Sequence, residues 1–216
     1  MGLRVRSYLT LARDAEVETE VKRSRFLATL RRVDSEEAAR AVVEEQRRAR
    51  WDAGHHCSAL RIRQDSVERS SDDGEPAGTA GAPMLEVLRG HEGDGVVDVV
   101  AVVTRWFGGT LLGAGGLVRA YGDAVRAALV ETGTLRRSLV REHLLELDHA
   151  DAGRVESELR ARGIAVLETT YAARVALVLG GPPDQEARLA ALVAELTAGA
   201  VATRVAGERW VDTLDP

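Results

Sequence analysis

The sequence has 216 residues, of which 45% are hydrophobic and 29% charged, and its formal net charge is −5 at pH 7. This composition is that of a folded globular protein of one or two domains and excludes wholesale disorder. No apolar run approaches the roughly 20 residues of a membrane span, and the N-terminus lacks a secretory signal pattern. The single cysteine, Cys57, suits a reducing compartment, so we expect a cytoplasmic protein with no membrane association.

Charge is unevenly distributed along the chain. Residues 22–63 carry 11 Lys or Arg against 6 Asp or Glu, a net charge of +5, so the rest of the chain carries −10. All basic residues except Lys22 are arginine, whose planar guanidinium suits phosphate and carboxylate groups. The acidic total therefore conceals a basic segment. Residues 135–216, with 10 Arg against 13 Asp or Glu, are a poor candidate for contact with phosphate.

Periodicity and turn signals predict the elements of the first part of the chain. In order, these are strands at 17–21 and 26–33, a helix at 35–50, a strand at 57–63, a polar loop at 64–81, a helix at 83–88, a strand at 96–104, a glycine-rich turn at 108–116 and a helix at 117–131. Ser35 suits the N-cap of the first helix and Pro83 the first turn of the second. The apolar run 96–104 is nearly continuous, which indicates a strand buried on both faces.

After Gly133 the pattern changes to a compact series of elements. We expect a strand at 138–148, a helix at 150–162, strands at 164–170 and 172–179, a helix at 184–198 that Asp184 caps, and a strand within 199–210. This β-α-β-β-α-β order is the split βαβ pattern of ferredoxin-like domains. The sequence therefore predicts an α+β protein with two domains, at 1–134 and 135–216.

The first candidate site is the acidic loop that runs from Ser70 to Gly81. Its carboxylates, Asp72, Asp73 and Glu75, could bind a hard cation through oxygen or supply a general base. The alternative is a tight loop in which carboxylate side chains accept bonds from backbone N–H groups. Composition alone favours this second interpretation, because Asp-Asp-Gly is common in turns.

The second candidate site is the segment 104–122, where a buried strand ends, a glycine-rich loop follows and a helix begins. Such a helix start points several backbone N–H groups into one concavity, where an anion can bind. Arg105 and Arg119 flank the loop, and each could bind a phosphate through two N–H groups. The segment matches neither a Walker A loop nor a dinucleotide fingerprint. The alternative is that the glycines only permit close packing of helix on sheet.

A third group, His55-His56-Cys57, consists of metal-ligand residue types. Neighbouring side chains of a strand point to opposite faces, which argues against one chelate. A cysteine nucleophile with a histidine base is one alternative. The other is that Cys57 begins a buried strand and one histidine lines a cleft.

A fourth group is basic. It comprises Lys22, Arg23, Arg25, Arg31, Arg32, Arg47, Arg48 and Arg50, with Trp51 available for stacking. These residues could form a phosphate-binding face. The alternative is a solvated helix face on which the arginines pair with neighbouring glutamates.

Four strings, which occur in this order, carry a family resemblance. They are 22–26 (KRSRF), the pair 55–56 (HH), 71–83 (SDDGEPAGTAGAP) and 103–122 (VTRWFGGTLLGAGGLVRAYG). Together they closely resemble the YigZ/IMPACT family, over roughly residues 16–131. Residues 138–210 resemble the C-terminal domain of its bacterial members, so we expect a bacterial-type protein without the RWD domain of the eukaryotic relatives.

The resemblance implies both a fold and a function. The fold is an N-terminal α/β domain of the ribosomal-protein-S5 second-domain type, followed by a ferredoxin-like domain similar to domain V, the last domain, of elongation factor G. Eukaryotic members regulate translation, and the bacterial branch is thought to bind nucleic acid or the ribosome. Trp106 and Phe107 stand where the family often has two tyrosines, and Ala82 where it often has lysine. The motif positions that the resemblance marks are His55, His56, Asp72, Asp73, Gly74, Glu75, Gly78, Thr79 and Gly81.

We therefore predict a protein that binds RNA or the ribosome through the cleft beside the two glycine loops and modulates translation. The expected phosphate contacts are Lys22, Arg23, Arg25, Arg105, Gly108, Gly109, Gly113, Gly115, Gly116 and Arg119. No catalytic residue, metal or cofactor is assigned. One alternative is an enzyme like the small-molecule kinases, with Asp72 or Asp73 as base or Mg²⁺ ligand. The other is a protein-interaction module that titrates a translation regulator.

Overall fold

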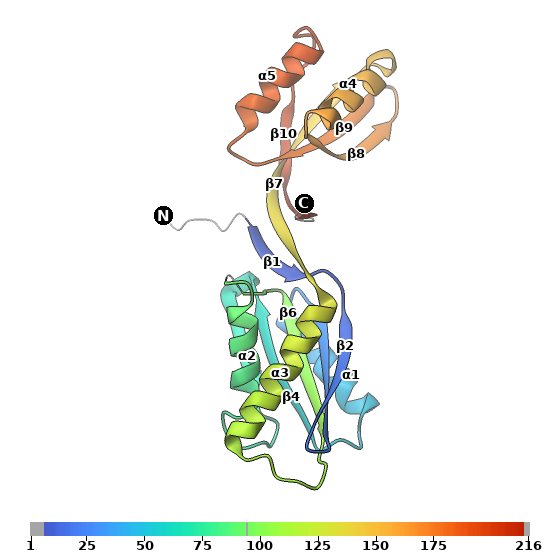
Figure 1. Ribbon diagram of the computed structural model, residues 1–216. Coiled ribbons are helices and arrows are strands. Elements are labelled where there is room, and N and C mark those ends of the chain that lie inside the picture. The colour runs from blue at the N-terminus through green and yellow to red at the C-terminus, as the bar shows by residue number, and fades with distance from the viewer. Residues whose placement is uncertain (1–6, 94, 214–216) are drawn as a thin grey trace. The chain divides into compact units, whose positions relative to one another are not determined.

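Figure 1 shows the computed structural model, which describes residues 7–93 and 95–213. The chain divides into two compact units between residues 136 and 137. Of the described residues, 7–136 and 213 belong to the first unit and 137–212 to the second. No helix among them is long and apolar enough to cross a membrane.

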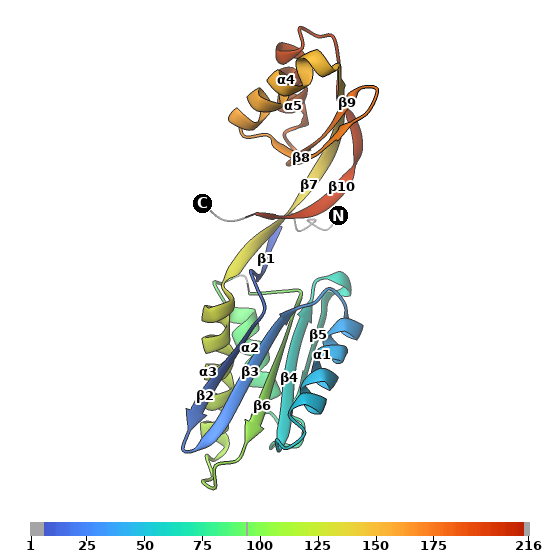
Figure 2. The same cartoon turned by 90° about the vertical axis from the view of Figure 1, so that its right-hand side faces the viewer.

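The first unit is a five-stranded sheet with helices on both faces (Figures 1 and 2). Its strands lie in the order β2 (Ala15–Val21), β3 (Ser24–Arg32), β6 (Val99–Trp106), β4 (His55–Ile62) and β5 (Val67–Ser71). Every neighbouring pair is antiparallel. Helix α1 (Glu36–Ala49) packs on one face, and α2 (Gly81–Gly90) and α3 (Ala114–Thr132) pack on the other.

Strand β6 is the centre of this unit, and its alternation explains the two cores. Val99, Ala101 and Val103 face α2 and α3, whereas Val100 and Val102 face α1. All five are fully buried, which confirms the sequence prediction of a strand covered on both faces. The last residues of β6 therefore lie at one end of the sheet, next to both glycine loops.

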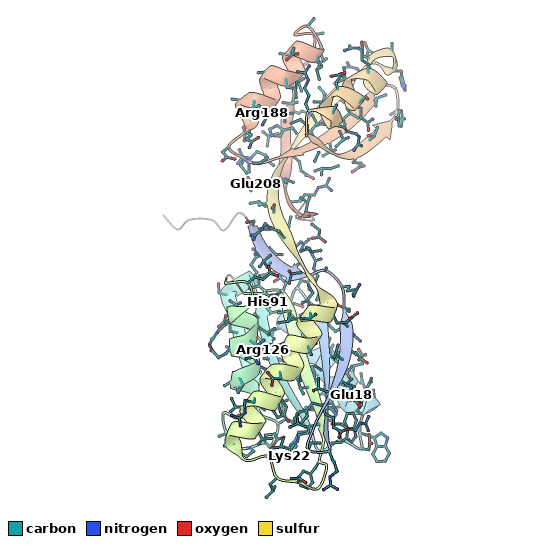
Figure 3. All side chains as sticks on the ribbon, viewed as in Figure 1. Glu18, Lys22, His91, Arg126, Arg188 and Glu208 are labelled. Atoms are coloured by element: carbon teal, nitrogen blue, oxygen red, sulfur yellow. The ribbon has the colours of Figure 1, made fainter. Side chains whose placement is uncertain are left out.

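A two-residue turn joins β2 to β3. Lys22 and Arg23 form it, with φ angles of 49° and 67°, between the paired residues Val21 and Ser24. Such a turn favours asparagine and glycine, because a positive φ strains residues with larger side chains. The sequence contains no asparagine. The chain instead presents two basic side chains at a strained hairpin tip, which lies at the bottom of Figure 3.

The second unit has the β-α-β-β-α-β order that the sequence predicts. The elements are β7 (Thr134–Leu147), α4 (His149–Ala161), β8 (Ala165–Tyr171), β9 (Val175–Gly181), α5 (Glu186–Leu196) and β10 (Arg204–Thr213). Strand β7 lies between β10 and β9, and β8 pairs with the other edge of β9. Leu145 and Leu177 belong to its own core with both helices. The predicted α+β class, with an α/β domain followed by a β-α-β-β-α-β domain, is confirmed.

Several local predictions were wrong for identifiable reasons. Strand β1 (Ser7–Leu11) was not predicted. The expected polar loop 64–81 contains a short 3₁₀ turn, η1 (Gln64–Ser66), and edge strand β5, whose backbone pairing with β4 holds a sequence without apolar alternation. Helix α5 begins one residue after Gln185, its N-cap, so Asp184 is not the cap. The predicted Ser35 cap is correct, because its hydroxyl accepts a bond from the N–H of Ala38.

Candidate functional site

The two glycine loops border one hollow of about 450 Å³, which we call the loop hollow. The first loop contributes residues 75 and 76, and the second contributes residues from 107 onward. Strands β4 and β6 and the start of α3 complete it. The lining residues are His55, Glu75, Pro76, Arg105, Phe107, Leu111, Leu112, Gly113, Ala114 and Leu117.

The register of the sheet brings the polar residues of the loop hollow together. His55 of β4 and Phe26 of β3 are both paired with Arg105, from the two sides of β6. Directly opposite residues of a sheet project from the same face. The guanidinium carbon of Arg105 consequently lies 5.4 Å from the ring centre of Phe26, and 5.7 Å from that of Phe107 in the second loop.

A buried ion pair forms the floor of the loop hollow. Arg105 Nη1 donates to Glu75 Oε1 at 2.5 Å, and the two side chains are only 7% and 4% exposed. The hydroxyl of Tyr121, on α3, donates to the same oxygen at 2.7 Å. Burial raises the pKa of Tyr121 far above its ordinary value, so this group stays a donor. Two polar atoms of the pair, Glu75 Oε2 and Arg105 Nε, make no hydrogen bond to any described residue.

His55 is held in one orientation beside this pair. Its Nδ1 lies 2.9 Å from the carbonyl oxygen of Asp73, and since a carbonyl only accepts, Nδ1 carries the hydrogen. Its Nε2 lies 3.9 Å from Glu75 Oε1. In the neutral ring this second nitrogen is an acceptor at the wall of the loop hollow.

The two aspartates of the first loop are bound by the protein itself. The carboxylate of Asp72 accepts bonds from the backbone N–H groups of Gly78, Ala80 and Gly81, at 2.8–3.0 Å. Burial raises the pKa of Asp72, but these three bonds outweigh it and leave the pKa below its ordinary value. Asp73 accepts from the N–H of His56 at 2.6 Å and from Arg47 at 2.7 Å.

These contacts favour the loop-shaping interpretation of the first loop. A cation or a substrate proton would have to displace strong donors from Asp72 or Asp73. Thr79 also closes the loop by donating its hydroxyl to the carbonyl of Pro76 at 2.6 Å. Gly74 and Gly78 adopt φ angles of 86° and 76°, which the turns between these bonds require. Among the residues that the structure describes, no group of three or more His, Cys, Asp or Glu is placed to hold a metal ion.

The surroundings of Cys57 and His56 do not fit a catalytic pair of a cysteine nucleophile and a histidine base. Burial raises the pKa of the Cys57 thiol to about 12, so it stays protonated, and its Sγ lies 3.3 Å from the hydroxyl of Tyr121. This geometry does not support a cysteine nucleophile. Burial lowers the pKa of His56, whose backbone N–H binds Asp73. Of the two histidines, only His55 lines the loop hollow.

The start of α3 opens into the loop hollow without a cap. Its N-cap residue is Gly113, with φ of 71°, and no side chain of a described residue accepts a bond from the free N–H groups of the first turn. That turn, which contains Gly115 and Gly116, has no acidic residue. Gly113 and Ala114 both line the hollow. The arrangement leaves several donors and the positive end of a 19-residue helix directed at one small space.

The second loop is fastened to the basic hairpin by backbone contact. The N–H of Gly108 donates to the hydroxyl of Ser24 at 3.1 Å, and a Cβ on Gly108 would lie 2.0 Å from the carbonyl carbon of Arg23. Arg23 Nη2 donates to the Thr110 hydroxyl at 3.2 Å. Gly109, exposed and with φ of 82°, turns the chain away from the hairpin.

Arg25 and Arg119, which were also predicted to contact phosphate, do not line the loop hollow. Arg25 pairs with Glu18 and stacks over Trp106, at 4.7 Å from the ring centre. Arg119 lines a second hollow, of about 760 Å³ between α2 and α3, that also contains Arg126. Arg105 and Arg119, predicted to flank the glycine-rich loop and each to bind phosphate, therefore line two separate hollows.

Sequence reasoning missed Tyr121 and Ser24, which hold Glu75 and Gly108 in place. The α-helical spacing of Leu117, Ala120 and Tyr121 indicates a buried face of α3. From that spacing, Tyr121 can be predicted to be buried. A buried tyrosine hydroxyl needs a hydrogen-bond partner, and this was the available signal.

The family description of the Impact N-terminal domain matches residues 22–129, half of the chain. The chain belongs to the IMPACT family. A second match, to a domain of unknown function called DUF1949, covers residues 145–200. The resemblance carried by the four strings of the sequence is therefore confirmed.

Two bacterial relatives share most of their length with this chain. IMPACT family member YvyE of Bacillus subtilis is 41% identical over 170 residues, which are 78% of this chain and 77% of the relative. IMPACT family member YigZ of Escherichia coli is 39% identical over 198 residues, or 90% and 96%. A solved structure described as the crystal structure of a hypothetical protein is 38% identical, with a TM-score of 0.60 and coverage of 92% and 97%.

Proposed function

We propose that this IMPACT-family chain binds RNA, free or within the ribosome, through the loop hollow and the hairpin tip beside it, and modulates translation in the cytoplasm. The observation that carries the proposal is the uncapped start of α3, whose unpaired backbone N–H groups open into the hollow. An RNA phosphate supplies the acceptor that these N–H groups lack. The translational role rests on family membership.

The surroundings of the loop hollow support nucleic acid over a free anion. Lys22 and Arg23 make no ion pair with any described residue, and the strained turn keeps both at the hairpin tip. Phe107 and Leu111, on the second loop, are 57% and 83% exposed and offer a surface for bases. A strained turn that keeps two cations exposed is a pointer to function.

The test uses Ala114→Asp, which places a carboxylate in the exposed first turn of α3. An acidic residue there favours the helix but repels phosphate. We expect the affinity for a labelled single-stranded RNA to fall at least tenfold, and thermal stability to stay equal or rise. The matched control is Ala187→Asp, in the exposed first turn of α5, which leaves RNA binding unchanged. Unchanged RNA affinity in folded Ala114→Asp would refute the proposal.

A salt titration tests the hairpin separately. Lys22→Ala/Arg23→Ala removes two cations, and we expect the slope of log K against log salt to fall by about 1.4, at about 0.7 per phosphate contact on a single strand. Arg119→Ala, in the second hollow, tests whether the RNA also contacts that hollow, in which case the RNA affinity falls. Binding that is insensitive to salt and to RNase, but is retained with ribosomal proteins, would instead identify a protein-interaction module.

A further inference from the structure

We propose that the loop hollow receives one guanine base of the bound RNA, which it distinguishes from the other three bases. The inference rests on the proposed function and adds a sequence preference to it. It begins from two acceptors at the hollow that no described residue satisfies, Glu75 Oε2 and His55 Nε2. The carboxylate belongs to a side chain that is only 4% exposed, so a ligand that leaves it unpaired loses affinity.

The charge of the site favours a neutral partner for these acceptors. Arg105 already balances the carboxylate of Glu75, so the pair needs no further cation. The positive start of α3, which lines the same hollow, disfavours an ammonium group. The ligand that fits is therefore a neutral group with several N–H donors, joined to an anion. A nucleotide has this construction.

Guanine presents the donors that the two acceptors require. Its Watson–Crick edge carries the N1–H and the N2 amino group side by side, so two acceptors can be satisfied together. Adenine and cytosine each offer one amino group beside a ring nitrogen that is an acceptor. The lone pair of that nitrogen would be repelled by the lone pair of Glu75 or His55. Uracil offers one N–H between two carbonyl oxygens. Unstacked bases of single strands are commonly read on this edge.

The walls and the volume suit a base. At about 450 Å³ the loop hollow falls in the range of small-ligand sites. Its walls include Pro76, Leu112 and Leu117, which can cover the faces of a ring, while Phe107 stands at the exposed rim. The acceptors and the first turn of α3 lie in the same hollow, so a base and its own phosphate can be bound together.

The experiment compares four labelled eight-residue RNAs, each a run of uridines with G, A, C or U at one central position. The full chain should bind the G probe about tenfold more tightly than the other three, a factor typical of one bidentate base contact. Glu75→Gln keeps an oxygen for Arg105 and Tyr121 but turns the free acceptor into a donor. It should remove the preference, so that the G probe binds no more tightly than the other three.

Two further variants keep the test interpretable. His55→Ala removes the second acceptor without touching the ion pair, so it should also reduce the preference for G, even if Glu75→Gln is poorly folded. Glu86→Gln, an exposed glutamate that lines the second hollow, is the control and should retain the preference. Guanosine monophosphate should displace the G probe more weakly than unlabelled G oligonucleotide does, because it lacks the phosphates that reach the hairpin.

Each outcome bears on one of the two proposals. Equal binding of all four probes, a preference for another base, or a preference that persists in both folded variants overturns guanine recognition, while a tenfold loss in Ala114→Asp still upholds RNA binding. Stronger competition by the free nucleotide than by the oligonucleotide overturns the placement of the base in RNA. Unchanged binding of every probe to Ala114→Asp overturns the proposed function itself.

Discussion

Asp72 and Glu75 are carboxylates three residues apart that the fold uses in different ways. Asp72 gathers three backbone N–H groups at the start of α2 and fixes the course of the first loop. Glu75 turns inward to Arg105 and Tyr121, and leaves one oxygen at the loop hollow. The first carboxylate is saturated and the second is not, which separates a structural role from a binding role within one short motif.

The role of Asp72 predicts a pH-dependent loss of stability. Asp72→Ala should lower the free energy of unfolding by about 1–3 kcal/mol at pH 7, because three N–H groups lose their acceptor. The pKa of Asp72 is lower in the folded protein than in the unfolded chain. Its stabilisation is therefore complete above the unfolded-state pKa, about 3.9, and fades as the pH falls through the folded value.

Urea unfolding of the wild type and the variant at pH 7 and pH 3.5 measures this difference. The gap between the two proteins should narrow at the lower pH. Asp123→Ala, which removes an exposed pair with Arg126, is the control and should change stability by less than about 0.5 kcal/mol. A gap for Asp72→Ala that is constant with pH would show that its ionised form is not what binds the N–H groups.

At the residue scale, the sequence identifies the candidate site residues better than it predicts their contacts. Both loops stand out by composition, and the loop-shaping reading of the aspartates is favoured by turn chemistry. The pairing of Arg105 with Glu75 spans 30 positions and depends on the register of β4 against β6. No local pattern specifies that register, so the arginine was expected to bind phosphate directly and its buried partner was not foreseen.

At the scale of elements, the second loop is a junction where backbone meets backbone. Gly108 has no room for a side chain beside Arg23, whereas a Cβ on Gly115, in the first turn of α3, meets nothing within 4 Å. The two glycines therefore serve different ends. The first allows the loop to lie against the hairpin, and the second leaves the helix start open to a ligand.

Alanine substitutions at these two glycines should have opposite effects. Gly108→Ala should destabilise the protein by about 1–3 kcal/mol or more, since backbone rather than a flexible side chain must move. Gly115→Ala should stabilise it by about 0.4–1 kcal/mol, because alanine favours the helix and restricts the unfolded chain. Chemical denaturation measures both. Equal effects of the two substitutions would mean that the loop and the hairpin are not in the contact described.

Element prediction succeeded where burial imposes a period and failed at edges. Strand β6 and helix α3 follow from apolar patterns, because both are packed against the core. Strand β5 was missed, since backbone pairing with β4 holds it and its side chains carry little pattern. Strand β1 was missed although four of its five residues are buried, because so short a segment shows too few apolar positions to reveal a period. Helix α3 begins at Ala114 rather than at the predicted 117, because its first turn consists of small residues that give no apolar signal.

At the scale of the whole molecule, the two compact units have separate hydrophobic cores. The cores of the first unit are built on β3, β4 and β6, and that of the second on β7 and β9. The cores share no member. Both units are acidic in total, but the +5 segment at 22–63 belongs to the first unit, which carries the loop hollow. The net charge of −5 therefore does not describe the surface that we propose to meet RNA.

Separate cores predict that damage to one unit stays local. Leu177 is fully buried in β9, and Leu177→Ala should destabilise the second unit by about 2–5 kcal/mol. Hydrogen exchange followed by mass spectrometry should show faster exchange at 141–147 and 175–181, the paired segments of β7 and β9, with unchanged protection in β3 and β6. RNA affinity should not change. Leu30→Ala, in the first core, should give the reverse pattern and weaken RNA binding, whereas equal loss of protection in both units from either variant would show one cooperative core.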